Sequence, residues 1–322
     1  MQAQSAALLD RDPVAAHEVA VAMLEHTQDA NDLWLESRAH LLVGACAARR
    51  MLLGEAQSHL RRSAEIEAIV GRHREIARVR SWQVMVENRC ADFESARLLG
   101  NDGLEAARAC EAWDLIYSIL GNLANTAVWA GDLQTARNNL TESLRLGEQR
   151  GYDNSSQQSL LGEVEIGLGN LDRGVRLLEQ ARDAAAPQSR ALSVHRVHLP
   201  LLLGLAYLAR GRENDARICA ESIRGEIDAF ACYYVHPQMH LWSAAQFLRM
   251  LGYRESESFA RAARIRLTEI AATIDDERTR TRFQDFVFNR LIAANAETQD
   301  PLKAWYLPYA IDEMPVTARS VR

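Results

Sequence analysis

The chain has few of the residues that punctuate a fold built from many strands. It contains 17 Gly and 7 Pro among 322 residues, and a multi-stranded fold needs such residues at most of its reversals. No stretch approaches the roughly 18 consecutive apolar residues that span a bilayer. Residues 1–12 also lack the basic start and apolar centre of a secretory signal. We therefore expect an all-α protein that is cytoplasmic and does not enter a membrane.

Cysteine and positive charge are also scarce. The five cysteines are odd in number, widely separated and never in a C-x-x-C pair, which excludes a disulfide framework and a cysteine zinc site and is typical of a reducing compartment. The 37 Lys and Arg are outnumbered by 43 Asp and Glu, giving a net charge of -6. Direct binding to nucleic acid is therefore not expected.

The usual catalytic motifs are missing as well. The sequence contains no G-x-S-x-G elbow, no G-x-x-x-x-G-K phosphate loop and no strand-led G-x-G-x-x-G. The glycines of Gly162–Gly169 lie in a helical pattern without a preceding strand or a lysine. We predict a protein that is not an enzyme and has no cofactor.

An internal repeat dominates what is present. In the clearest copy, Gly204 to Ala216, a small residue lies twelve positions before a second small residue, and the same step recurs in Gly44 to Ala56, Ala124 to Ala136 and Gly162 to Gly174. The second positions recur at intervals of 40, 40, 40, 38, 42 and 40 residues: Ala16, Ala56, Ala96, Ala136, Gly174, Ala216 and Ser256. Apolar residues on either side follow helical spacing, so each repeat is predicted to be a pair of closely packed helices.

Turn-like residues separate the two helices of each predicted pair. They occur at Leu53-Gly54, Ala91-Asp92, Ala130-Gly131-Asp132, Gly169-Asn170, Arg210-Gly211 and Leu251-Gly252. Gly100 and Gly103 depart from the pattern because they fall inside a predicted second helix. A bend there or close packing against a neighbouring helix would account for them.

These small residues and the twelve-residue step resemble the tetratricopeptide repeat family. The 40-residue period is similar to the longer variant in the arrays of maltose-activator-type bacterial regulators. The resemblance implies a right-handed α-solenoid of about seven helix pairs over residues 1–275 and a capping helix over 276–297. Beyond them, we expect residues 298–322 to form an extended, aromatic-containing tail.

In that family the first helix of each repeat lines a concave groove. Carried over to this chain, the predicted ligand-binding residues are Arg38, Arg49, Arg78, Asn88, Arg89, Asn125 and Trp129. Guanidinium groups pair with carboxylates or phosphates, and amides pair with peptide backbone, so the ligand would be an acidic peptide or a small anionic effector. Alternatively, these arginines are solvated or paired with Glu on adjacent helices.

The C-terminal half of the predicted groove is apolar, with Leu201, Leu205 and Leu241 on its floor. An aromatic cluster follows in the tail: Trp305, Tyr306, Leu307 and Tyr309. We expect this cluster to pack on the capping helix, with a cover over the apolar groove as the alternative.

Four histidines begin two successive first helices: His195, His198, His236 and His240. Adjacent helices could bring these rings together around a zinc ion. No H-E-x-x-H spacing accompanies them, so we expect structural histidines and treat a metal site as the remote alternative.

The sequence thus predicts an interaction or sensor module that binds a protein, peptide or anionic effector and regulates through a partner. We expect it to be either a stand-alone adaptor or the sensory part of a longer protein. An assembly scaffold that forms a homo-oligomer through the solenoid face or the tail is the alternative. A metal-dependent enzyme using the histidines is a more remote one.

Overall fold

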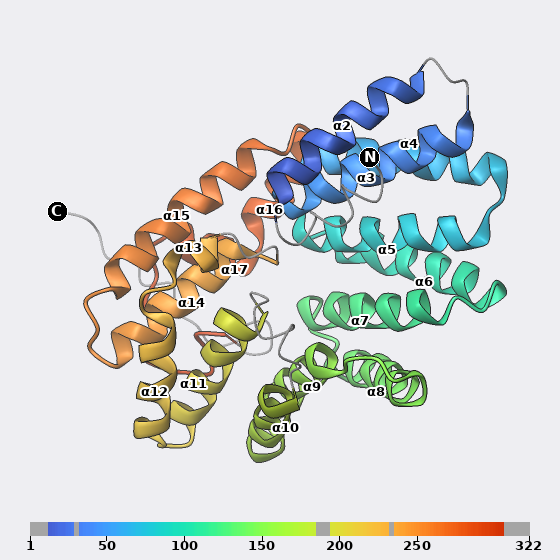
Figure 1. Cartoon of the computed structure of the whole chain (residues 1–322). Helices are drawn as coiled ribbons and strands as arrows, with labels where there is room; N and C mark the ends of the chain where they lie inside the picture. Colours follow the sequence, from blue (N-terminus) through green and yellow to red (C-terminus); the bar gives the residue numbers. More distant parts are fainter. Residues whose placement is uncertain (1–11, 29–31, 185–193, 232–234, 306–322) are drawn as a thin grey trace. The chain divides into compact units, whose positions relative to one another are not determined.

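A computed structural model describes residues 12–28, 32–184, 194–231 and 235–305, and in these residues all regular secondary structure is helical (Figure 1). The predicted all-α fold is therefore confirmed. None of the described helices is both long and apolar enough to cross a bilayer.

The chain divides into two compact units. Unit 1 comprises residues 1–126 and 270–283, and unit 2 comprises residues 127–269 and 284–322. Unit 1 contains α2 (Pro13–Gln28), α3 (Leu33–Arg49), α4 (Leu53–Val70), α5 (His73–Arg89), α6 (Phe93–Ala109) and most of α7 (Trp113–Trp129). Unit 2 contains α8 (Leu133–Arg150), α9 (Ser155–Gly167), α10 (Leu171–Ala184), the π-helix η2 (Val194–His198), α11 (Leu199–Ala209), α12 (Glu213–Ile223), α13 (Ile227–Ala231), α14 (Pro237–Met250) and α17 (Val287–Ala293). Helix α15 (Ser256–Ala272) begins in unit 2 and ends in unit 1, and α16 (Glu277–Asp285) begins in unit 1 and ends in unit 2.

The helices follow the predicted repeat. The seven recurring small residues lie on α2, α4, α6, α8, α10, α12 and α15, each the second helix of a predicted pair. In four of these pairs, α3–α4, α5–α6, α9–α10 and α11–α12, the two helices pack directly on one another. The 40-residue period therefore corresponds to one helical hairpin.

Small residues let the paired helices approach closely. A Cβ atom added at Gly174 would lie 2.6 Å from the carbonyl oxygen of Gly162, so these two glycines face each other across the α9–α10 pair. A Cβ at Gly100 would lie 2.9 Å from Cγ of Leu123, and one at Gly103 would lie 2.7 Å from Cβ of Arg80. Because α6 is continuous through both positions, close packing rather than a break explains these two glycines.

The turns inside the pairs use a left-handed residue. Gly131, Gly169, Gly211 and Gly252 have φ between 69° and 83°, as the sequence pattern indicates. The α3–α4 turn is different, because Met51 takes the left-handed conformation with φ of 61° while Gly54 lies in the first turn of α4. The prediction of a turn at Leu53-Gly54 was therefore two residues too late.

Gly54 has another role, since a distant segment lies against it. The N–H of Gly54 donates to the carbonyl oxygen of Thr273 at 2.9 Å, and a Cβ at Gly54 would lie only 2.6 Å from that oxygen. The hydroxyl of Thr273 accepts from the N–H of Leu53 at 3.2 Å and donates to the carbonyl of Met51 at 3.0 Å. Thr273 thus caps α4, whose own N-cap residue makes no side-chain hydrogen bond.

A second contact fixes the same segment within unit 1. Arg282 forms an ion pair with Asp92, which also caps α6 by accepting from the N–H of Ser95. Residues 270–283 therefore join the turns of the second and third repeats across about 190 to 220 residues of sequence.

The predicted single capping helix over 276–297 is instead two short helices. Helix α16 ends at Asp285, Phe286 takes an extended ψ of 133° as the N-cap of α17, and α17 ends at Ala293. Of the predicted tail, residues 298–305 are described and end in consecutive turns, whereas Tyr306, Leu307 and Tyr309 lie outside the described residues.

Candidate functional site

Two of the predicted groove arginines converge on one carboxylate in unit 1. Arg78 on α5 donates its Nη1 to both oxygens of Glu75, at 3.0 and 2.9 Å. Arg38 approaches the same carboxylate from the neighbouring helix α3, with Nη1 3.4 Å from Oε2. The three side chains are 20%, 28% and 13% exposed for Arg38, Arg78 and Glu75. Two guanidinium groups contact the one carboxylate of Glu75, so this cluster has a formal charge of +1. These contacts show the geometry in which the two arginines bind a carboxylate.

The other two predicted arginines have structural contacts. The guanidinium carbon of Arg49 lies 5.7 Å from the centroid of the Trp82 ring, in cation–π geometry. Arg89 is buried and donates Nη1 to the carbonyl oxygen of Ala48 at 2.8 Å, which joins the end of α5 to the end of α3. Its main contribution is therefore to the packing of these helices.

The predicted amides differ from one another in their surroundings. Asn88 is only 7% exposed, and no described residue forms a hydrogen bond with its Oδ1. Asn125 donates to the carbonyl of Gly121 on its own helix at 3.3 Å. Asn122, which the repeat pattern does not single out, links α7 to α5 by donating to the carbonyl and hydroxyl oxygens of Ser81 at 3.2 and 3.1 Å.

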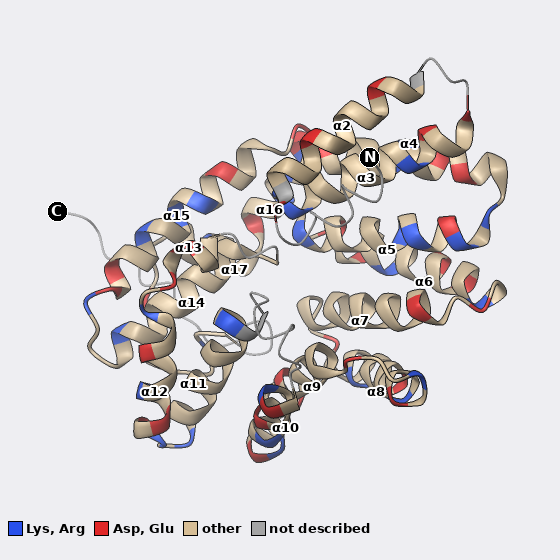
Figure 2. Cartoon of the chain, in the orientation of Figure 1, with Lys and Arg blue, Asp and Glu red and all other residues tan. Residues whose placement is uncertain are grey.

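Charged residues are unevenly distributed over the first helices (Figure 2). Helix α5 carries Arg74, Arg78, Arg80 and Arg89 against two glutamates, whereas α11 has no charged residue and α7 only Asp114. Helix α5 therefore carries more positive charge than α7 or α11.

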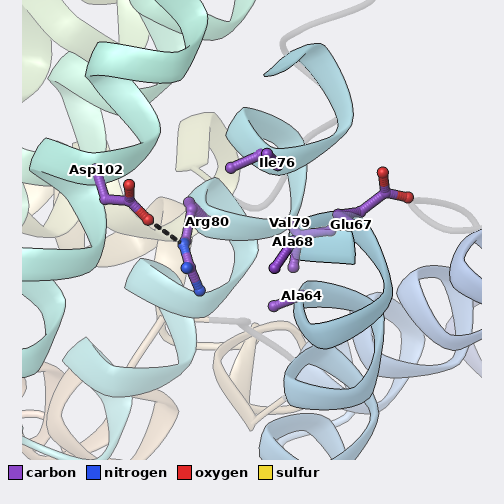
Figure 3. Close-up of a pocket in the computed structure, with 7 residues that line it drawn as sticks. All are labelled: Ala64, Glu67, Ala68, Ile76, Val79, Arg80 and Asp102. Atoms are coloured by element: carbon purple, nitrogen blue, oxygen red, sulfur yellow. Dashed lines mark hydrogen bonds and ion pairs between the residues drawn. The ribbon is translucent and has the colours of Figure 1, made fainter. Parts of the chain in front are cut away.

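A small cavity lies between α4, α5 and α6 in unit 1 (Figure 3). It is lined by Ala64, Glu67, Ala68, Ile76, Val79, Arg80 and Asp102, with Arg80 paired to Asp102. Its volume is about 190 Å³, below the roughly 300 Å³ at which small-molecule pockets begin. We assign no ligand to it.

Unit 1 also contains a histidine pair that the sequence pattern does not reveal. The Nδ1 atoms of His40 and His59 lie 2.9 Å apart, so one ring donates and the other accepts. Burial, together with the neighbouring His59, lowers the pKa of His40 to about 4. The pair is therefore held in its neutral form at physiological pH.

In unit 2, Trp129 belongs to an aromatic cluster rather than to an open surface. It is 6% exposed, and its ring lies edge-on to His236, Phe286 and Phe288 at centroid distances of 5.3, 6.3 and 6.2 Å. This packing joins the end of α7 to the segment that links α16 and α17.

Two of the four predicted histidines form a hydrogen-bonded chain. His240 donates Nδ1–H to the carbonyl of His236 at 3.0 Å, so its Nε2 is the acceptor for Nδ1–H of His198 at 2.9 Å. Burial, and next the proximity of His198, hold the pKa of His240 well below its usual value. Both ring nitrogens of His240 are thus engaged.

These contacts bear on the metal alternative. The side chain of His195 lies outside the described residues. Among the residues that are described, no three His, Cys, Asp or Glu side chains are grouped as metal ligands would be.

The indole of Trp305 lies against this histidine chain. Trp305 is 1% exposed, and its ring centroid is 5.2 Å from that of His198 and 4.7 Å from that of His240. Glu163 on α9 is fully buried nearby. Burial raises the pKa of its carboxyl to about 7, and the indole of Trp305 acts in the opposite direction. Trp305 therefore packs on first-helix residues of the repeats.

Main-chain groups before Trp305 contact the side chains of α14. Nε1 of Trp242 and Nε2 of Gln246 donate to the carbonyl of Ala296 at 3.0 and 3.4 Å. Oε1 of Gln246 accepts from the N–H of Thr298 at 3.0 Å. The hydroxyl of Ser243 donates to the carbonyl of Ala304 at 2.7 Å.

Comparison with known proteins finds relatives by structure alone. No family model matches the chain, and no curated protein matches it by sequence. The crystal structure of the apo form of RapI is 14% identical with a TM-score of 0.62, covering 80% of this chain and 94% of RapI. A Rap protein complexed with competence and sporulation factor is 13% identical with a TM-score of 0.58, covering 84% of this chain and 79% of the other. The chain has the tetratricopeptide-like helical-repeat fold that these Rap proteins share.

Proposed function

We propose that the chain is a protein-interaction or sensor module whose first-helix face in unit 1 binds an acidic peptide segment or a small anionic effector. The observation that carries this proposal is the convergence of Arg38 and Arg78 on Glu75. Two guanidinium groups from adjacent helices are already positioned around one carboxylate, and one positive charge is left over. An incoming carboxylate would be held in the way that Glu75 is held.

The surrounding residues fit an extended peptide. Asn88 offers a buried amide oxygen that no described residue uses, and such an oxygen can accept from a ligand N–H. Trp82, beneath Arg49, offers an aromatic surface beside it. Regulatory output would pass to a partner through changes in the stacking of the repeats.

A binding assay with an acidic peptide tests this function. Fluorescein-labelled hexaglutamate is titrated with the wild-type chain and with Arg78→Gln, which keeps the hydrogen-bonding capacity but removes the charge. We expect Arg78→Gln to weaken binding about tenfold, which corresponds to a loss of about 1.4 kcal/mol. Arg97→Gln is the matched control, because Arg97 is exposed on the second helix α6 and forms an ion pair with Glu94 one turn away on the same helix. Equal binding by wild type and Arg78→Gln would contradict the proposal.

A second candidate function, assembly with a further copy, is favoured by an exposed apolar edge of unit 1. Leu33 and Trp34 begin α3 and are 43% and 45% exposed, while Ile69 and Val70 end α4 and are 75% and 41% exposed. Since α3 and α4 are antiparallel, these four residues lie at one end of the hairpin, and exposed apolar groups of this kind often contact partners. Light scattering would detect a dimer that dissociates in Trp34→Glu, and a monomeric wild type would exclude this candidate.

A further inference from the structure

Helix α14, the first helix of its repeat, is buried on all sides along most of its length. Every described residue from Pro237 to Leu248 is buried, although a first helix that lines a groove should expose one stripe. His240, Ser243 and Gln246 recur along one side of the helix at intervals of three residues. Polar side chains on a buried stripe need hydrogen-bonding partners, so the groups that cover this stripe must supply them.

Two of these polar residues, Ser243 and Gln246, form hydrogen bonds with the main chain of residues 296–305, whereas His240 bonds to His198 and to the carbonyl of His236. Gln246 uses both ends of its amide on this segment, donating to Ala296 and accepting from Thr298. Ser243 donates to Ala304. Side-chain amides and hydroxyls that pair with backbone groups recognise a peptide whatever its sequence, and here they recognise the chain's own C-terminal segment.

Trp305 supplies the sequence-specific part of the contact. Its ring lies in the corner formed by His198 and His240, beside the buried Glu163. The indole is also a hydrogen-bonding neighbour of the buried Glu163 carboxyl. The anchor is therefore a specific and well-packed contact.

We propose that the surface formed by His198, His240, Ser243 and Gln246, here termed the α14 seat, is a second peptide-binding site distinct from the arginine cluster of unit 1. Residues 296–305 are its internal ligand. The external ligand is a tryptophan-bearing protein segment that places its indole where Trp305 lies and its preceding carbonyl groups on Ser243 and Gln246. Binding of that segment requires release of the internal one.

A peptide-exchange experiment tests the proposal on the full chain. The probe is a fluorescein-labelled synthetic peptide with the sequence of residues 294–309, measured by fluorescence anisotropy against wild type and Trp305→Ala. An internal ligand acts at an effective concentration near the millimolar range, so we expect Trp305→Ala to bind the probe at least tenfold more tightly than wild type. A probe in which the tryptophan is replaced by alanine should bind neither protein.

The seat itself provides the matched control. Adding Gln246→Ala to Trp305→Ala should weaken probe binding again, whereas adding Arg217→Ala, on the second helix α12, should not. If Trp305→Ala has the helical circular dichroism of wild type but does not bind the probe, or if it binds no better than wild type, the proposal is wrong.

Hydrogen exchange on the wild-type chain keeps the test valid if Trp305→Ala does not fold. Excess unlabelled probe should accelerate exchange of the amides of residues 298–305 as the internal segment is displaced. Unchanged protection of these amides at millimolar probe would overturn the proposal. This outcome is independent of the hexaglutamate assay, which reports on unit 1 only.

Discussion

The buried carboxyl of Glu163 should make the stability of the chain depend on pH in a direction opposite to that of an ordinary salt-bridged carboxylate. Burial raises the pKa of Glu163 from 4.5 to about 7. The folded chain therefore holds this proton more tightly than the unfolded chain does. The resulting stabilisation is complete below pH 4.5 and is lost as the pH rises through 7.

The size of the effect follows from the two pKa values. Each tenfold change in the ionisation equilibrium corresponds to about 1.4 kcal/mol, so the displacement from 4.5 to about 7 amounts to about 3 kcal/mol. The variant Glu163→Gln keeps the shape and polarity of the side chain but has no charge to bury. It should have nearly the stability of wild type at pH 4.5 and be more stable by about 3 kcal/mol at pH 8.

Urea unfolding followed by circular dichroism at pH 4.5, 6 and 8 measures this difference. Glu148→Gln is the matched control, because Glu148 is exposed near the end of α8 in the same unit, and it should change stability little at any pH. Comparing variants at each pH removes the contribution of other titrating groups, such as His240. If Glu163→Gln gains nothing at pH 8, or gains equally at all three values, the reasoning about its burial is refuted.

Two further predictions concern close packing. Gly54→Ala places a methyl group 2.6 Å from the carbonyl oxygen of Thr273, so it should destabilise unit 1 by about 1–3 kcal/mol. The effect is measurable as a lower midpoint of thermal unfolding. An unchanged midpoint would mean that residues 270–283 do not pack against Gly54. Gly204→Ala places a methyl group 2.8 Å from Cε1 of the Phe247 ring and should lower the free energy of unfolding by a similar amount. Gly225→Ala is the control and should be nearly neutral, because its added methyl group meets no neighbouring side chain or backbone within 4 Å. Equal losses of stability at both glycines would contradict the packing argument.

Most of the fold can be predicted from the sequence because its contacts are local and periodic. Gly162 and Gly174 are twelve residues apart, and their close approach across one hairpin is visible in the spacing alone. The 40-residue recurrence then extends the same argument along the chain.

Features that depend on distant residues could not be predicted in this way. Gly54 has the composition of a turn, and only the position of Thr273, more than 200 residues later, shows that it permits a close contact instead. Phe286 breaks the predicted capping helix without a proline or glycine to indicate it.

The candidate sites also combine contacts that local spacing predicts with contacts that depend on distant residues. Repeat register places Arg38 and Arg78 on first helices, and the Arg78–Glu75 pair follows from their three-residue spacing on α5. That Arg38 shares the same carboxylate emerges only when α3 and α5 are packed side by side. The spacing of His236 and His240 indicates a possible metal pair, yet the hydrogen bonds of His240 to the His236 carbonyl and to the His198 ring engage both of its nitrogens. Neither distinction is encoded in local spacing.

Native mass spectrometry of the chain purified from its own host tests the central claim, that unit 1 binds an acidic ligand, most directly. We expect a retained peptide or small anion that is present in wild type and in Arg97→Gln and is lost from Arg78→Gln. A ligand retained equally by all three proteins, or a wild-type chain that carries none and does not bind hexaglutamate, would contradict the account.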